Sequence, residues 1–233
     1  MAPKGAAQPG SARRFAVPAM NSDRIARIYR WVEYLSFGGA LQACRVMYLK
    51  DVADRRRALL CGDGDGRFLA ELLRTNREVC VDFVDLSAGM VGVAQRRVGA
   101  MGPEAGGRTN FHVGDLRKLK ANASADYDLI ATHFFLDCFD DRDAGYVARR
   151  LASVAAPDAT LLVSDFRIPA SGAMRNIASA IVRGLYAAFR ITTGLRVTRL
   201  PDYEGALERA GFRKQRETLK LGGLLAASIW KKE

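Results

Sequence analysis

The chain has 233 residues, of which 49% are apolar and 26% charged, fractions that are ordinary for a globular protein. They exclude a fibrous or wholly disordered chain, and no stretch reaches the roughly 18 uncharged apolar residues that a membrane span needs. The net charge of +11 is dispersed along the chain, mostly as isolated arginines, so it points only weakly to a nucleic-acid partner.

The first residues, 1–21, are rich in Ala, Pro, Gly and Arg and predict a disordered leader rather than an export signal. Residues 22–233 then predict a single domain. Within it, residues 22–52 show helical spacing with a break at Gly38 and Gly39, which predicts two helices before the core.

Apolar and helical segments alternate from residue 58 to residue 166, which indicates parallel strands with helices on the faces of an α/β sheet. The residues 99–107 are rich in glycine and predict a loop. Asp140 or Asp141 predicts the start of a helix. The predicted strands are residues 58–62, 79–85, 110–115, 127–135 and 160–166.

The alternation of apolar and helical segments ends after Phe166. Residues 171–203 predict a helical insert, a short helix ends at Gly211, and β-like runs on either side of Gly222 and Gly223 predict an antiparallel hairpin.

The stretch "LLCGDGDGRFL" (59–69) places glycines at 62, 64 and 66 between a strand and a helix, where backbone can approach a ligand closely. Asp63 and Asp65 would repel a phosphate, so the loop favours a cationic or zwitterionic ligand. S-adenosylmethionine fits, because it carries a sulfonium, an ammonium and a carboxylate and no phosphate. The alternative is that both aspartates only bond turn backbone.

Two further strand ends carry acids. Asp85 lies where a carboxylate accepts ribose hydroxyls, as in adenosine cofactors generally. Asp115 lies where a carboxylate receives an adenine amino group while Leu116 offers its backbone N–H to the ring. Three strand ends are therefore predicted to converge on one adenosine.

With these residues in place, the segment from about Ala58 to Lys231 resembles the class I S-adenosylmethionine-dependent methyltransferases of the small-molecule type. The resemblance implies a Rossmann-like three-layer sandwich, a mostly parallel sheet with a reversed C-terminal strand hairpin. It also implies S-adenosyl-L-methionine as the cofactor. The predicted cofactor-binding residues are Gly62, Asp63, Gly64, Gly66, Asp85, Leu86, Asp115, Leu116 and Thr132.

One position departs from the family pattern: many members carry an acid two residues before the first glycine, and this chain has Leu60. Asp63 or Asp65 could take over that role, and the sequence leaves the choice open.

The methyl acceptor is predicted to lie at the end of the fourth strand, where open parallel sheets bind ligands. His133 is the first candidate for a general base, because its ordinary pKa lies near neutrality; the alternative is a histidine half-buried under a helix. Asp137 is the second catalytic candidate; the alternative is that its side chain only forms hydrogen bonds within the loop. Residues 22–52 and 171–203 are predicted to form a lid, or else to pack ordinarily against the sheet.

These features predict an enzyme that methylates a small, partly hydrophobic organic acceptor of the quinone or natural-product type. Rival hypotheses are an RNA or protein methyltransferase, a noncatalytic module that binds the cofactor, and an NAD-dependent oxidoreductase, which the GxGxG spacing disfavours. The helix with Arg175 and Arg190 leaves weak membrane-surface contact open.

Four scattered cysteines (Cys44, Cys61, Cys80 and Cys138) without a CxxC pair, and only two histidines, predict no disulfide and no metal. We expect reduced, buried thiols in a cytoplasmic protein. The oligomeric state is not predicted.

Overall fold

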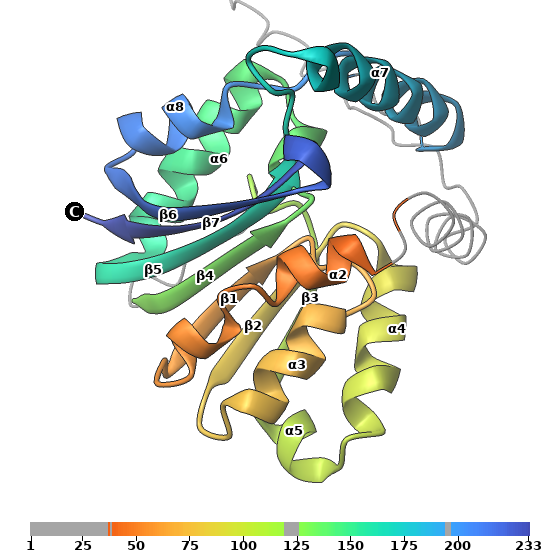
Figure 1. Cartoon of the computed structure of the whole chain (residues 1–233). Helices are drawn as coiled ribbons and strands as arrows, with labels where there is room; N and C mark the ends of the chain where they lie inside the picture. Colours follow the sequence, from red (N-terminus) through yellow and green to blue (C-terminus); the bar gives the residue numbers. More distant parts are fainter. Residues whose placement is uncertain (1–36, 38, 119–125, 194–196) are drawn as a thin grey trace, which may run out of the picture.

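The computed structural model describes residue 37 and the ranges 39–118, 126–193 and 197–233 (Figure 1). The predicted leader, and the predicted N-terminal helices up to residue 36, lie outside these residues. Of the predicted helical segment 22–52, the structure shows α2 (Ala40–Arg45) and the short 3₁₀ helix η1 (Leu49–Val52).

The core is a seven-stranded sheet with the order β3-β2-β1-β4-β5-β7-β6. Strands β1 to β5 run parallel, and β7 and β6 are antiparallel to their neighbours. This confirms the predicted Rossmann-like fold with a reversed C-terminal hairpin. The strands are β1 (Arg57–Cys61), β2 (Cys80–Asp85), β3 (Thr109–Val113), β4 (Tyr127–His133), β5 (Ala155–Phe166), β6 (Phe212–Lys220) and β7 (Leu225–Lys232).

Helices cover both faces of the sheet because each buries one apolar stripe. Phe68 of α3 and Val91 of α4 pack with Leu60 on one face, whereas Leu151 of α6 packs with Trp230 on the other. The longer elements between strands are α3 (Arg67–Thr75), α4 (Ala88–Gly99), α6 (Asp141–Val154), α7 (Ala173–Thr193) and α8 (Tyr203–Arg209), with 3₁₀ turns η2 (Leu136–Cys138) and η3 (Leu221–Gly223).

Local signals explain where several elements begin and turn. The Asp140 side chain accepts the Asp143 N–H at 2.8 Å and caps α6, as predicted. Gly222 and Gly223, with φ of 63° and 91°, make the turn of the C-terminal hairpin.

Two predictions about local structure were wrong. The segment 99–107 contains the short helix α5 (Pro103–Gly107), which begins with proline at its first turn, a position that suits a residue without an N–H. Among the four thiols, which are all free, Cys44 and Cys61 are buried, but Cys80 and Cys138 are exposed because they lie at the start of β2 and in the η2 turn. No helix in the described ranges is both long and apolar enough to cross a membrane.

Candidate active site

The glycine loop joins β1 to α3 at the carboxyl end of the sheet, and all three of its glycines have positive φ, between 62° and 75°. A Cβ on Gly62 would lie 2.3 Å from Cδ2 of Phe135, and one on Gly66 would lie 2.8 Å from Cβ of Ala94. A Cβ on Gly64 would meet nothing within 4 Å. Gly62 and Gly66 thus serve internal packing, and Gly64 presents bare backbone to open space.

The two aspartates of this loop have different environments. The Asp65 side chain is 12% exposed, and its carboxylate pairs with Arg67 at 3.1 Å and Arg97 at 3.0 Å. Asp63 is buried, and its Oδ2 accepts the Leu69 N–H at 3.0 Å. The loop is therefore less negative than the sequence predicts, because arginines compensate Asp65.

Asp63 is an incompletely bonded buried carboxyl. Within the described ranges its Oδ1 has no hydrogen-bond partner. Burial raises the pKa of Asp63 to about 7, although the Arg45 guanidinium and the Leu69 N–H act in the opposite direction. A cation placed beside this group would draw off its proton and pair with it.

Asp85 ends β2 and accepts two backbone N–H groups, from Ser87 at 2.8 Å and from Gly64 at 3.2 Å. Burial raises its pKa to about 6 in spite of these bonds. The next side chain, Leu86, is 64% exposed, and Val113 at the end of β3 is 57% exposed. Exposed apolar residues on two adjacent strand ends suit the flat face of a base.

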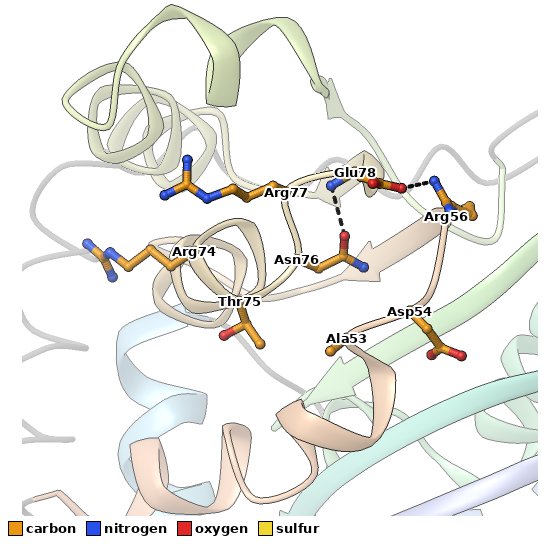
Figure 2. Close-up of a pocket in the computed structure, with 8 residues that line it drawn as sticks. All are labelled: Ala53, Asp54, Arg56, Arg74, Thr75, Asn76, Arg77 and Glu78. Atoms are coloured by element: carbon orange, nitrogen blue, oxygen red, sulfur yellow. Dashed lines mark hydrogen bonds and ion pairs between the residues drawn. The ribbon is translucent and has the colours of Figure 1, made fainter.

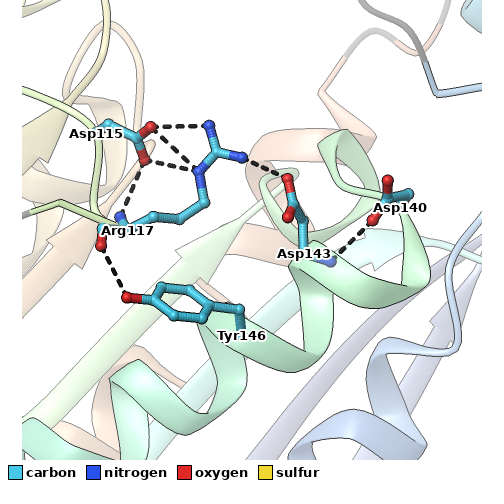
Figure 3. A network of polar contacts seen from close by, with 5 residues as sticks. All are labelled: Asp115, Arg117, Asp140, Asp143 and Tyr146. Atoms are coloured by element: carbon cyan, nitrogen blue, oxygen red, sulfur yellow. Dashed lines mark hydrogen bonds and ion pairs between the residues drawn. The ribbon is translucent and has the colours of Figure 1, made fainter. Parts of the chain in front are cut away.

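Asp115 follows β3. The Arg117 guanidinium donates hydrogen bonds of 3.0 and 2.8 Å to the two oxygens of its carboxylate (Figure 3). Burial acts to raise the pKa of Asp115, but the bonds and charge of Arg117 outweigh it and hold the pKa below its ordinary value. Arg117 also pairs with Asp143 of α6. Leu116 is buried among the apolar residues of the α6 face.

The end of β4 places Thr132 and His133 on opposite faces of the sheet. Thr132 is fully buried, and its hydroxyl lacks a hydrogen-bond partner among the residues described. His133 packs edge-on against Phe68, with ring centroids 4.4 Å apart, and its Nδ1 lies 3.0 Å from Ser164 Oγ. Burial, aided by the charge of Arg45, lowers the pKa of His133 to about 3.

These properties argue against the predicted role of His133 as a general base. Its ring is 3% exposed, and an imidazole with so low a pKa binds a proton weakly at neutral pH. Its environment is closer to the alternative, a histidine packed under a helix.

Asp137 lies in η2 directly beyond β4 and has an acidic neighbour that sequence reasoning missed. Asp165, at the end of β5, accepts the Asp137 N–H at 3.2 Å, and both side chains are buried. Burial raises the pKa of Asp137 to about 6. Tyr186 of α7 donates to the Asp137 carbonyl oxygen at 3.0 Å, so the predicted insert does contact this end of the sheet.

A groove in the described residues lies elsewhere (Figure 2). It has a volume of about 410 Å³. Residues before β1 line it, together with residues at the end of α3 and just after it, at the amino ends of the strands. Two of its charged residues, Arg56 and Glu78, pair with each other. This groove is separate from the cluster of strand-end acids.

Comparison with known proteins points to the same part of the chain. A family model described as a methyltransferase domain matches residues 58–158, which include the glycine loop, Asp85, Asp115 and Asp137. A curated relative, polyamine aminopropyltransferase 2 of Bacillus anthracis, is 32% identical over 90 residues, which are 37% of this chain and 25% of the relative. The chain thus spans about a quarter of that relative's length.

Solved structures agree on the fold. An O-methyltransferase family protein from Burkholderia thailandensis matches with a TM-score of 0.68 at 17% identity, over 91% of this chain and 58% of that one. The mitomycin 7-O-methyltransferase matches with a TM-score of 0.66 at 20% identity, over 84% of this chain and 55% of that one.

Proposed function

We propose that this chain, which belongs to the class I S-adenosylmethionine-dependent methyltransferases through its domain at residues 58–158 and its fold, methylates a small, partly hydrophobic organic acceptor. Quinone-like compounds and natural products are the acceptor types we favour. One observation carries the proposal: acids lie at or just beyond the ends of the three adjacent strands β1, β2 and β3, and Gly64, whose N–H bonds to one of them, Asp85, faces open space.

The residues present fit the parts of S-adenosylmethionine. Asp85 offers a buried carboxylate to ribose hydroxyls, and exposed Leu86 offers an apolar surface to the base. Asp115 suits the adenine amino group. Asp63, with its unbonded Oδ1 in the described structure, fits the ammonium group better than Asp65, which arginines neutralise.

When bound, the cofactor supplies an activated methyl group, so the protein mainly has to hold an acceptor in line with it. The ends of β4 and β5 are buried, so they would exclude water from one side of the acceptor. Asp137 is the remaining candidate for taking a proton from the acceptor, because burial raises its pKa to about 6 and so makes its carboxylate a stronger base.

Calorimetry with S-adenosylmethionine and S-adenosylhomocysteine tests the cofactor. We expect both to bind, and Asp85→Asn to weaken binding about tenfold to a hundredfold, the effect of losing charged hydrogen bonds. Asp82→Asn on the same strand, whose carboxylate faces Tyr127 and Asn110, is the control and should bind normally. Absence of binding by the wild type would overturn the proposal.

The matched relative supports a second candidate, transfer of an aminopropyl group to an amine. Incubation with metabolite extracts and polyamines, with S-adenosylmethionine as the methyl donor and its decarboxylated form as the aminopropyl donor, followed by mass spectrometry, separates the two. A methylated product supports our proposal, and an aminopropylated product contradicts it.

A further inference from the structure

The segment that follows β5 concentrates the positive charge of the chain. Residues 167–201 contain six arginines and neither lysine, aspartate nor glutamate, so they carry +6 of the net charge of +11. Helix α7 makes up most of this segment and contributes Arg175, Arg183 and Arg190. A basic helix without any acidic residue points to an anionic partner.

Helix α7 buries one face and exposes the other. Ala178, Val182 and Tyr186 are buried, at the spacing of one helical stripe. The three arginines of the helix are exposed. At about 100° per residue they lie within about 80° of one another around the helix axis, so they form one row. Neither Arg175 nor Arg190 pairs with an acid among the residues that the structure describes.

The tip of the C-terminal hairpin adds apolar side chains to this surface. A Cβ on Gly222 would lie 2.9 Å from Cε of Met174, so the tip contacts the first turn of α7 (Figure 1). Six large apolar side chains are exposed in the described residues, and three of them lie here: Ile177 of α7 with Leu219 and Leu221 of the hairpin, each 46% to 50% exposed. Arginines and exposed aliphatic side chains thus occur together.

We propose that α7 and the hairpin tip at residues 219–223 bind the surface of an anionic membrane, with the row of arginines on lipid phosphates and with Ile177 and Leu221 in the interface. The inference goes beyond the proposed function, because it concerns a partner and not the reaction. Basic residues attract anionic lipids, and apolar side chains enter the boundary between headgroups and acyl chains.

Charge and apolar exposure together favour a membrane over other occupants. The chain's own residues 1–36 have six basic and two acidic residues, a net charge of +4, so α7 would repel them. A second copy of α7 would bring three arginines against three. The phosphates of a nucleic acid suit the arginines but leave Ile177 and Leu221 in water, whereas a lipid surface accommodates both kinds of side chain.

The position of α7 connects this contact with the candidate active site. Tyr186, on the buried face of the helix, donates to the Asp137 carbonyl oxygen at 3.0 Å. The helix that would lie on the membrane therefore contacts the end of the sheet where we place the methyl acceptor. A partly hydrophobic acceptor concentrates in membranes, so surface binding would bring enzyme and acceptor together. This last step rests on the proposed function, and the membrane contact does not.

Co-sedimentation of the full chain with vesicles, without cofactor, tests the contact. One set of vesicles is pure phosphatidylcholine, and the other contains equal parts of phosphatidylcholine and phosphatidylglycerol. We expect binding to the anionic vesicles only, and release at about 1 M salt, where the Debye length is about 3 Å. Arg175→Gln, Arg183→Gln and Arg190→Gln together should weaken binding about tenfold to a hundredfold, because each arginine near an anionic surface contributes about fivefold.

A matched triple variant removes the same number of charges from exposed positions elsewhere: Arg77→Gln, Arg96→Gln and Arg149→Gln. It should bind the anionic vesicles nearly as well as the wild type does.

Ile177→Gln with Leu221→Asn tests the apolar side chains and should weaken vesicle binding severalfold. Both substitutes suit the local backbone, since glutamine favours a helix and asparagine tolerates the positive φ of Leu221, which is 50°. Thermal unfolding shows that each variant folds.

Each outcome decides a part of the proposal. Retention of the wild type on neither kind of vesicle, or equally on both, overturns the anionic membrane as partner. Equal losses in the two triple variants overturn α7 as the binding surface. Undiminished binding by Ile177→Gln with Leu221→Asn overturns the insertion of apolar side chains. Binding of a single-stranded RNA through the α7 arginines, without binding of vesicles, identifies a nucleic acid as the partner instead.

Discussion

Asp165 accepts the backbone N–H of Asp137 at 3.2 Å and thereby joins the ends of β5 and β4 through a fully buried carboxyl. Two acidic side chains share this site. Burial, followed by repulsion from Asp137, holds the pKa of Asp165 well above its ordinary value, and burial raises that of Asp137 to about 6.

This pair should make folding less favourable as the pH rises. Raised carboxyl pKa values mean that the folded state binds protons more tightly than the unfolded state, so the stability gained near pH 4 is lost through pH 6 and above. We expect the free energy of unfolding in urea to fall by on the order of 2 to 3 kcal/mol over that range.

Asp165→Asn should reduce this dependence without removing it, because Asp63 and Asp85 also have raised pKa values. It should stabilise the protein at pH 8 by about 1 kcal/mol or more, because an amide needs no proton. Asp54→Asn, at an exposed position, should retain the wild-type slope. A slope in Asp165→Asn equal to that of the wild type would show that the pair does not titrate in the folded protein.

Substitutions at two glycines of the loop should separate an effect on stability from an effect on ligand binding. Gly62→Ala puts a methyl group 2.3 Å from the Phe135 ring at a positive φ, and we expect a loss of about 2 to 4 kcal/mol in thermal or urea unfolding. Gly64→Ala has the same kind of φ but open space, so it should cost only about 1 kcal/mol.

For cofactor affinity we expect the reverse order, with a larger loss in Gly64→Ala than in Gly62→Ala. Gly64→Ala places its methyl group where we expect the ligand to approach the backbone, so its affinity for S-adenosylhomocysteine should fall at least about tenfold. Wild-type affinity in Gly64→Ala would mean that the ligand lies elsewhere.

The sequence predicted the parts of the site that depend on strand ends. Asp85 and Asp115 are recognisable because an acid directly follows a β-like run, and parallel strands bring such residues to one edge. Asp165 follows the apolar run "TLLVS" in the same way, so the same reasoning applied to β5 would have found it.

The missing parts depend on contacts between distant segments. Nothing in the sequence around Arg45 shows that a short helix buries it, and nothing in the sequence around Gly62 shows that Phe135 fills the space beside it. The environment of His133 could not be predicted either, because its burial depends on residues distant in the sequence and lowers its pKa from the ordinary value.

Arg117 competes with the predicted role of Asp115. Its guanidinium donates to both carboxylate oxygens of Asp115, at 3.0 and 2.8 Å, the same atoms that would accept an adenine amino group (Figure 3). Arg117→Gln should therefore bind adenosine-containing ligands severalfold more tightly in calorimetry, with a stability cost of at most about 1 kcal/mol for a partly exposed pair. Weaker binding would instead mean that Arg117 holds Asp115 in its binding orientation.

Asp63 should make cofactor binding depend on pH near neutrality. Its pKa of about 7 means that the carboxyl is partly protonated at pH 7, whereas a ligand cation prefers the carboxylate. Binding must therefore expel a proton at low pH, and the affinity for S-adenosylhomocysteine should rise toward pH 8 and fall up to about tenfold per unit below pH 7. Calorimetry in buffers of different ionisation enthalpy measures the released proton directly. Asp63→Asn should bind weakly at every pH and release none.

Asp65→Asn is the matched control on the same loop, because arginines already compensate its carboxylate. It should keep the wild-type pH dependence and proton release. If Asp65→Asn removed the dependence and Asp63→Asn kept it, Asp65 would be the residue that meets the cation, and the assignment of the ammonium to Asp63 would be wrong.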